Sequence, residues 1–274
     1  MVWFILFLFF SPLGFLYVAY LIYGKNAIPA FYYNKIKWQN SISRSEYDSL
    51  DLLLSKQLHF FKNLSLNGKA KFIHRLNHFK YQKRFIGEDG CVVTEEMKNV
   101  ISGAAIQLTF GLEHYLMDNI KGFVIYPTVF YNRIINKRLR GGTPPEGNMQ
   151  LSWQHVEHGF IYPSDKYNLA LHEFAHALKL TISHAEEFDM NFYKYIEEWE
   201  AVGAREFDQM KRSDDNFLRE YASVNMHEFF AVCVEHFFEV PEQFVYNLPH
   251  VYYHMCILLN IDPLNKTKDY RVEK

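Results

Sequence analysis

The sequence predicts a mostly helical domain with a small sheet, preceded by one N-terminal transmembrane helix. Along most of the chain, apolar residues recur at the spacing of helix faces, and only a few short runs are typical of strands. The 274 residues are 49% hydrophobic and 22% charged, which indicates a folded globular protein of one large or two small domains. The start of the chain differs from the rest, because it is one long apolar run.

The apolar run at residues 2–24 predicts the membrane span. It carries no charged side chain, and as a helix it would rise roughly 34 Å, enough to cross a bilayer core of about 30 Å. A cleaved signal peptide would need a basic start and a small-residue cleavage site, and the run has neither. A buried core helix would seldom be so uniformly apolar. We therefore expect a retained anchor over residues 1–24, with interface aromatics at Tyr17, Tyr20 and Tyr23.

The lysines after the span predict its orientation. Lys25, Lys35 and Lys37 follow the apolar run, whereas only the α-amino group precedes it. The positive-inside rule places such a cationic flank in the cytoplasm. The sequence therefore predicts a single-pass protein of the inner (cytoplasmic) membrane, with the body of the chain on the cytoplasmic side.

The chain beyond the anchor divides into three parts by composition. We predict a juxtamembrane linker at residues 25–45, one folded domain at 46–264 and a polar tail at 265–274. Within the folded domain, leucines and phenylalanines at helical spacing predict helix from Ser45 to about Lys80.

Shorter elements follow in the same domain. Thr94 is a good helix N-cap with acidic residues after it, and this helix is expected to reach about Leu116. The remaining patterns predict, in chain order, two short strands around a glycine turn at 84–93, a strand at 122–126, a loop rich in glycine and proline at 141–147, and a strand at 150–153.

The chemistry of the chain is indicated by the motif His172-Glu173-Phe-Ala-His176. Residues 164–178 around it contain no glycine or proline and have apolar residues at helical spacing. On a helix, histidines at i and i+4 share one face and can bind one Zn²⁺ together. Glu173 can then accept the proton of a zinc-bound water as that water attacks a carbonyl. Such a string also arises by chance, but the helical setting favours a metal site.

A catalytic zinc site needs a third protein ligand and an open position. The chain lacks the further glycine and histidine that would extend the motif shortly after His176. A carboxylate on a second helix is the usual alternative, and the candidates are Glu200, Glu206, Glu228 and Glu235.

The stretch at residues 221–235 separates these candidates. Asn225 can cap a helix that has Glu228 in its first turn, among apolar residues where an unpaired carboxylate would be costly. Glu235 lies two turns later on nearly the same face, and it suits the acceptance of a hydrogen bond from a ligand imidazole. A solvated helix face is the alternative for either carboxylate.

The two motifs together, at residues 172–176 and 221–235, resemble the Mlc titration factor A family of zinc-dependent peptidases, which are of the gluzincin type. The catalytic domain of anthrax lethal factor is similar more remotely. The resemblance extends over roughly residues 50–264. It implies an α+β zincin-like fold and an aminopeptidase-like activity. It also implies Zn²⁺ as the cofactor, Glu228 as the third zinc ligand and Tyr221 as a hydrogen-bond donor to the transition state.

The resemblance also implies a protein partner, because the bacterial protein that gives the family its name binds and sequesters a sugar-responsive repressor. One position of the chain departs from the family. Lys179 stands where an aspartate is common, which puts a supporting carboxylate in doubt.

We therefore predict a membrane-anchored zinc metallopeptidase that acts on peptides. The first alternative is a regulator-binding protein on the same scaffold with weak catalysis, although such a protein would not need Glu173. The second is a structural zinc, but structural sites usually have four protein ligands. A net charge of −2 without a basic stripe predicts no nucleic-acid partner, and three widely spaced cysteines form no disulfide framework.

Overall fold

The computed structural model describes residues 42–133, 135–145, 147–182, 190–212 and 216–273. The chain divides into two compact units, Met1–Asp48 and Ser49–Lys274. The elements below belong to the second unit, except that helix α4 (Arg44–Gln57) begins in the first.

Helices make up most of the second unit. They are, in chain order, α5 (His59–Lys62), α6 (Leu66–Gln82), α7 (Glu95–Leu108), α8 (Trp153–Ile161), α9 (Leu169–Ile182), α10 (Met190–Met210), α11 (Met226–Glu239), α12 (Pro241–Asn247) and α13 (Pro249–Leu259), with short 3₁₀ helices η2 (Glu220–Ser223) and η3 (Lys266–Lys268).

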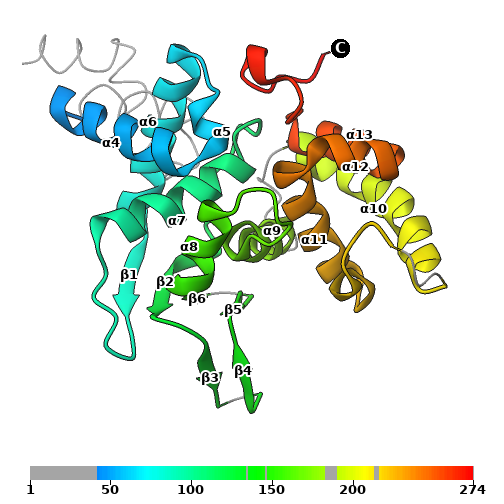
Figure 1. The fold of residues 1–274 in the computed structure, drawn as a ribbon, viewed down its shortest axis with the longest axis horizontal. Coiled ribbons are helices and arrows are strands. Elements are labelled where there is room, and N and C mark those ends of the chain that lie inside the picture. The colour runs from blue at the N-terminus through cyan, green and yellow to red at the C-terminus, as the bar shows by residue number, and fades with distance from the viewer. Residues whose placement is uncertain (1–41, 134, 146, 183–189, 213–215, 274) are drawn as a thin grey trace, which may run out of the picture. The chain divides into compact units, whose positions relative to one another are not determined.

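The described strands form one small sheet and one hairpin. The sheet has the order β1 (Arg84–Gly87), β2 (Ile120–Tyr126), β6 (Gly147–Ser152) and β5 (Gly141–Gly142). The first three strands are parallel, and β5 runs antiparallel to β6 at the edge. The antiparallel hairpin of β3 (Phe130–Asn132) and β4 (Lys137–Leu139) lies between β2 and β5 in the chain (Figure 1).

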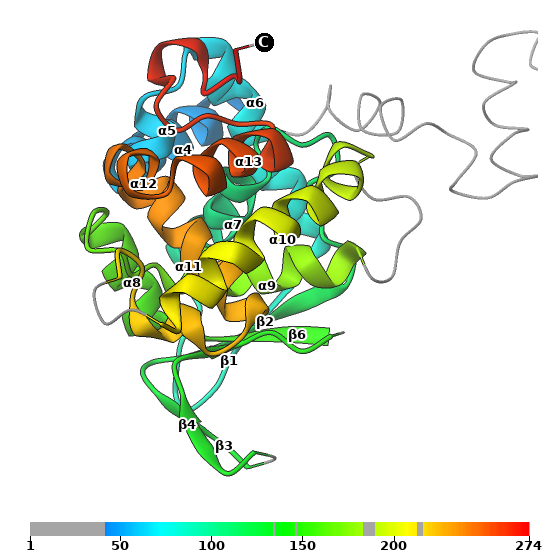
Figure 2. The same cartoon turned by 90° about the vertical axis from the view of Figure 1, so that its right-hand side faces the viewer.

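Helices α9 and α11 lie side by side at the centre of this unit (Figures 1 and 2). Helix α9 also packs on α7, on α8 and on strands β5 and β6. Its Phe174 is fully buried, with its ring 5.8 Å from that of Phe123 in β2. On α11, Phe230 is fully buried and packs edge-on against Trp199 of α10. Tight packing on several sides fixes both helices, and with them the side chains on their facing surfaces.

The predicted N-terminal transmembrane helix needs correction. In the part of the chain that the structure describes, none of the helices is both long and apolar enough to cross a bilayer. The run at residues 2–24, which motivated the prediction, lies outside the described residues. An uncharged run of spanning length meets only a criterion of composition and length, so it does not by itself establish a spanning helix. The described fold is α+β, mostly helical with small sheets, and the inner-membrane localisation is withdrawn together with the anchor.

The predicted start of the helix after residue 94 is confirmed, but its predicted end is not. Thr94 caps α7, because its hydroxyl accepts a hydrogen bond of 3.2 Å from the amide of Met97. The same helix ends at Leu108 rather than Leu116. A side chain at Gly111 would place its Cβ 2.1 Å from the carbonyl oxygen of Asn260, so the chain there is shaped by its close approach to the end of α13.

The second strand predicted within 84–93 is wrong. The chain turns at Asp89 and Gly90, which have φ of 51° and 80°, but β1 then pairs in parallel with β2 and not with the residues after the turn. The predicted loop at 141–147 contains the short strand β5, and the strand predicted at 150–153 begins earlier, at Gly147.

Candidate metal site

Helix α9 carries both histidines, and Asn168 caps its N-terminus. The side chain of Asn168 accepts a hydrogen bond of 3.1 Å from the amide of Leu171, and its carbonyl accepts one of 2.9 Å from the amide of His172. This is the arrangement of a helix N-cap, which fixes the first turn. His172 and His176 follow one turn apart on the same face.

Helix α11 presents Glu228 toward that face. The side chain of Asn225 accepts hydrogen bonds from the amides of His227 and Glu228, at 2.8 and 3.0 Å, so the N-cap predicted from the sequence is confirmed. The cap places Glu228 in the first turn of α11. Because α11 packs along α9, its carboxylate reaches the two imidazoles.

Three donor atoms meet at this point. Nε2 of His172 lies 3.2 Å from Nε2 of His176 and 3.0 Å from Oε2 of Glu228, and the remaining distance, from His176 to Glu228, is 3.4 Å. Ligands placed tetrahedrally at 2.0–2.1 Å from a zinc ion are about 3.3 Å apart. The two nitrogens and one oxygen therefore have the spacing and the chemistry of a zinc site. Among the described residues, this is the one group of three or more such side chains close enough to hold a metal ion.

The charges at this cluster favour a cation. Burial opposes ionisation of Glu228, but hydrogen bonds from His172 and His176 outweigh it and hold the pKa of the carboxyl well below its usual range. Burial alone would likewise lower the pKa of His172, yet its hydrogen bonds to Glu228 and Glu235 raise that pKa to about 10. Without a metal, these shifts favour a protonated His172 beside an ionised Glu228. A divalent cation can replace that proton.

Glu235 lies behind His172, on the side away from Glu228. Its Oε1 accepts a hydrogen bond of 2.7 Å from Nδ1 of His172, and its Oε2 accepts one of 2.7 Å from the amide of Asn168. With Nδ1 donating to Glu235, Nε2 is the nitrogen that can offer its lone pair to a metal once its proton has left. The carboxylate is 1% exposed, and burial works to raise its pKa, but His172 and Arg219 together hold that pKa below the usual range.

Sequence reasoning missed Arg219, which contacts both oxygens of Glu235. Its Nη1 donates to Oε2 at 2.9 Å and to the carbonyl oxygen of Lys166 at 2.6 Å, while its Nη2 donates to Oε1. The guanidinium also lies over the ring of Tyr167, 4.6 Å from its centroid. Arg219 thus fixes the orientation of the carboxylate that in turn orients His172.

Glu173 points to a different part of the site, toward the sheet edge. It is buried, and its Oε2 accepts a hydrogen bond of 2.8 Å from the hydroxyl of Thr143. Gly141 of β5 passes so close that an added Cβ would lie 2.4 Å from Oε1 of Glu173. Burial raises the pKa of this carboxyl, so it is a stronger base than an exposed glutamate. Neither Thr143 nor Gly141 was singled out in the sequence.

Tyr221 lies on η2, just before α11, at the open side of the cluster. Its ring centroid is 5.9 Å from that of His172, and its side chain is 49% exposed. Burial of the hydroxyl, the charge of Glu228 and a hydrogen bond to Glu228 raise its pKa to about 12. The phenol therefore stays protonated at neutral pH and can donate a hydrogen bond.

A groove of about 880 Å³ opens beside these residues. His172, Glu173 and Tyr221 lie in its wall, together with Arg140 from the β4–β5 connection and Glu220 from η2. Its volume falls within the range of about 300–1,000 Å³ that is usual for sites of small ligands.

The other carboxylates considered from the sequence lie on α10, outside the cluster. Glu200 accepts a hydrogen bond of 2.7 Å from Nζ of Lys179, and the same Nζ lies 5.7 Å from the centroid of the Phe230 ring. The lysine that replaces the common aspartate of the family thus has its own counter-ion on the next helix. Glu206 lies on the same helix and is not part of the donor set.

Comparison with known proteins identifies the family of the chain. The sequence profile of a family described as glucose-regulated metallo-peptidase M90 matches residues 35–258. An uncharacterized protein of Synechocystis, slr2042, is 26% identical over 234 residues, which cover 77% of this chain and 83% of the relative. Mlc titration factor A of Yersinia enterocolitica is 24% identical over 231 residues, with coverage of 77% and 85%. The protein of the same name from Yersinia pestis is 26% identical over 208 residues, with coverage of 68% and 75%. The resemblance predicted from the two motifs is confirmed, and the chain belongs to the glucose-regulated metallo-peptidase M90 family.

Proposed function

We propose that this chain is a zinc-dependent peptidase in which His172, His176 and Glu228 bind the metal. The observation that supports this most is the set of three donor atoms 3.0–3.4 Å apart, two imidazoles and a carboxylate, beside an open groove. When bound there, a zinc ion would act as a Lewis acid that makes a water more acidic and polarises a peptide carbonyl. We further propose that residues 46–264 form the peptidase domain, followed by a polar tail at 265–274.

Glu173 is proposed as the general base. Its carboxylate accepts a proton from the attacking water and passes it to the leaving amine. The hydroxyl of Thr143 donates to Oε2, so the carboxylate is held in one orientation while the other oxygen faces Gly141 and the groove. Tyr221 is proposed to donate a hydrogen bond to the carbonyl oxygen as negative charge develops on it. Its raised pKa suits this role, because a donor must keep its proton.

An aminopeptidase-like specificity needs a group that binds the free amine of the substrate. Glu220 lies in the groove wall next to Tyr221, and its side chain is exposed. The other two carboxylates in this wall, Glu173 and Glu235, are engaged by Thr143 and Arg219. We therefore propose Glu220 as the amine-binding group.

The function is tested by hydrolysis of a panel of amino-acid anilides and internally quenched peptides. The wild-type chain loaded with zinc should cleave members of the panel, and Glu173→Gln should bind zinc equally well but cleave none of them detectably. Cleavage that survives in Glu173→Gln would refute the assignment of the base. If amine recognition is right, Glu220→Gln should raise KM for the anilides and leave peptides with a blocked amino terminus unaffected.

A second function is proposed from the relatives. Both Yersinia relatives described above are named Mlc titration factor A, and that name describes a protein that titrates a regulator. A regulator-binding role for this chain would not require the basicity of Glu173. Glu173→Gln therefore separates the two functions, because it should abolish hydrolysis and leave the binding of a protein regulator unchanged.

A further inference from the structure

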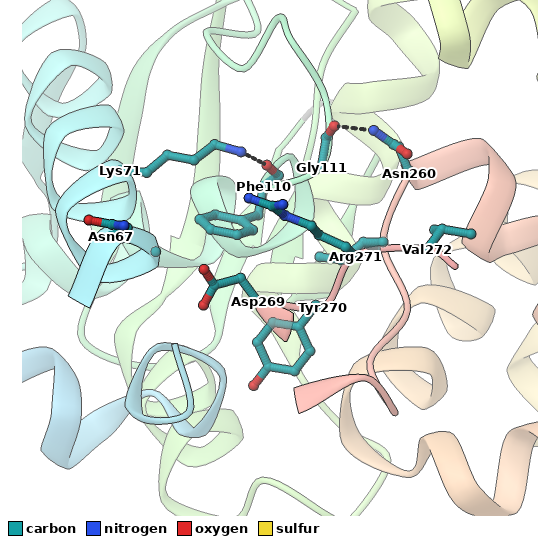
Figure 3. Close-up of a pocket in the computed structure, with 11 residues that line it drawn as sticks. Asn67, Lys71, Phe110, Gly111, Asn260, Asp269, Tyr270, Arg271 and Val272 are labelled. Carbon is teal, nitrogen blue, oxygen red and sulfur yellow. Dashed lines mark hydrogen bonds between the residues drawn. The ribbon is translucent and has the colours of Figure 1, made fainter. Parts of the chain in front are cut away.

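A second cavity, of about 470 Å³, lies apart from the metal site and shares no lining residue with the groove (Figure 3). Its walls come from segments far apart in the chain. They are the first turns of α6, the residues after α7, the end of α13, and the C-terminal segment at residues 269–272. Its volume also falls in the range of about 300–1,000 Å³ that small-molecule sites occupy.

Two cationic side chains point into this cavity. Nζ of Lys71 donates a hydrogen bond of 2.9 Å to the carbonyl oxygen of Phe110 and lies 4.4 Å from the centroid of that ring. Figure 3 shows the guanidinium of Arg271 directed toward the same point from the C-terminal segment. Behind them, Arg75 donates to the carbonyl oxygens of Thr109, Phe110 and Leu112. Two positive charges therefore line the cavity, and that of Arg75 lies behind them.

One carboxylate, Asp269, lines the cavity, and it is engaged elsewhere. It accepts hydrogen bonds from the amide of Ser65 at 2.6 Å and from the hydroxyl of Ser65 at 2.7 Å. It also lies against α6 so closely that a Cβ on Gly68 would be 2.6 Å from its Oδ1. The carboxylate is thus fixed at the start of α6, and the two cationic side chains that line the cavity exceed it by one charge.

Both burial and the neighbouring charges act on Lys71. Burial lowers the pKa of its ammonium, and the positive charges of Arg75 and Arg271 lower it further, to about 8. The negative charge of Asp269 acts in the opposite direction but does not compensate. A bound anion would relieve this repulsion.

We propose that this cavity binds a small molecule through a phosphate group, with Lys71 and Arg271 as its cationic contacts. A phosphate monoester carries a charge of about −1.5 to −2 at neutral pH, enough to pair with both Lys71 and Arg271. Arginine offers a planar pair of donors and lysine a compact charge, and both are common partners of phosphate. The ring of Phe110 and the side chains of Ile261 and Val272 offer an apolar wall to the rest of the ligand.

The test is isothermal titration of the full-length, metal-free chain with phenyl phosphate at constant ionic strength. Benzoate, a monoanion of similar shape, is the reference ligand. We expect saturable binding of one phenyl phosphate per chain, with benzoate binding at least about tenfold more weakly. Metal-free protein is used so that phosphate cannot bind to zinc, and the result does not depend on peptidase activity.

The variants Arg271→Ala and Lys71→Met should each weaken the binding of phenyl phosphate by about tenfold or more, the scale of one charge-assisted contact. Lys268→Ala is the matched control, because it removes a charge from the end of η3, directly before the C-terminal segment, at a residue that does not line the cavity. Absence of saturable binding, equal affinity for benzoate, or equal weakening in all three variants would each overturn the proposal.

Discussion

Glu235 accepts a hydrogen bond from Nδ1 of His172, while Nε2 of the same ring faces Glu228 and His176 on the opposite side. One imidazole thus connects a fully buried carboxylate to the proposed metal position. The carboxylate fixes both the tautomer and the direction of the ring. The two glutamates of α11 therefore have distinct proposed roles, since one contacts the metal and the other orients a ligand.

This difference predicts unequal effects on metal binding. Glu228→Ala removes one of three donors and should reduce zinc affinity far more than Glu235→Ala, for which a loss of about 10–100-fold is expected. Affinities are to be measured by competition with a zinc chelator of known strength. The roles would have to be exchanged if Glu235→Ala released the metal more readily than Glu228→Ala.

Arg219 should act only through Glu235. Arg219→Ala removes the hydrogen bonds that the guanidinium donates to both oxygens of that carboxylate. Glu235 then keeps only His172 and the amide of Asn168, so it orients His172 less firmly and zinc affinity should fall by about 10–100-fold. The double variant Arg219→Ala/Glu235→Ala should be little weaker than Glu235→Ala alone, because interacting residues are not additive. Additive losses in this cycle would show that Arg219 acts by a separate route.

Tyr221→Phe should keep the fold and the zinc but lower kcat. The hydroxyl is at the open side of the site, and removing one such donor from a developing oxyanion costs about 10²–10³ in turnover. Steady-state kinetics of zinc-loaded protein test this, with Tyr246→Phe on α12, an exposed tyrosine away from the groove, as the control. An unchanged kcat in Tyr221→Phe would exclude this residue from the reaction.

Zinc binding should depend on pH through His172. In the metal-free site its pKa is raised to about 10, so at pH 7 the ring is protonated and zinc must displace that proton. We expect release of about one proton per zinc at pH 7, and an affinity that rises with pH up to about pH 10 and then levels off. Calorimetry in buffers of different ionisation enthalpy measures the proton count. Binding without proton release at pH 7 would contradict the arrangement.

The sequence predicted the parts of the site that depend on local spacing. The i, i+4 histidines, the cap at Asn225 and the position of Glu228 in a first turn all follow from the period of one helix. Thr143 and Gly141 could not be predicted in this way. They reach Glu173 only because β5, at the edge of the sheet, packs on α9. Both residues are about 30 positions from Glu173 in the chain, and such a separation carries no periodic signal.

Arg219 illustrates the same limit. It precedes Glu235 by 16 residues, and nothing in the pattern marks it as the partner of a buried carboxylate. The pairing arises because η2 folds back along α11 and brings the arginine to the rear of His172. The parallel pairing of β1 with β2 was likewise missed, because a glycine turn after a strand favours a hairpin in the absence of tertiary information.

The central claim, that His172, His176 and Glu228 bind a catalytic metal, is tested most directly by zinc stoichiometry. The full-length chain is reconstituted with zinc, freed of unbound metal and analysed for zinc per chain, with circular dichroism to verify folding. The wild type and Glu173→Gln should each retain about one zinc, whereas His172→Ala and His176→Ala should retain little. A folded wild-type chain that retains no zinc, or His172→Ala and His176→Ala variants that retain it fully, would contradict the claim.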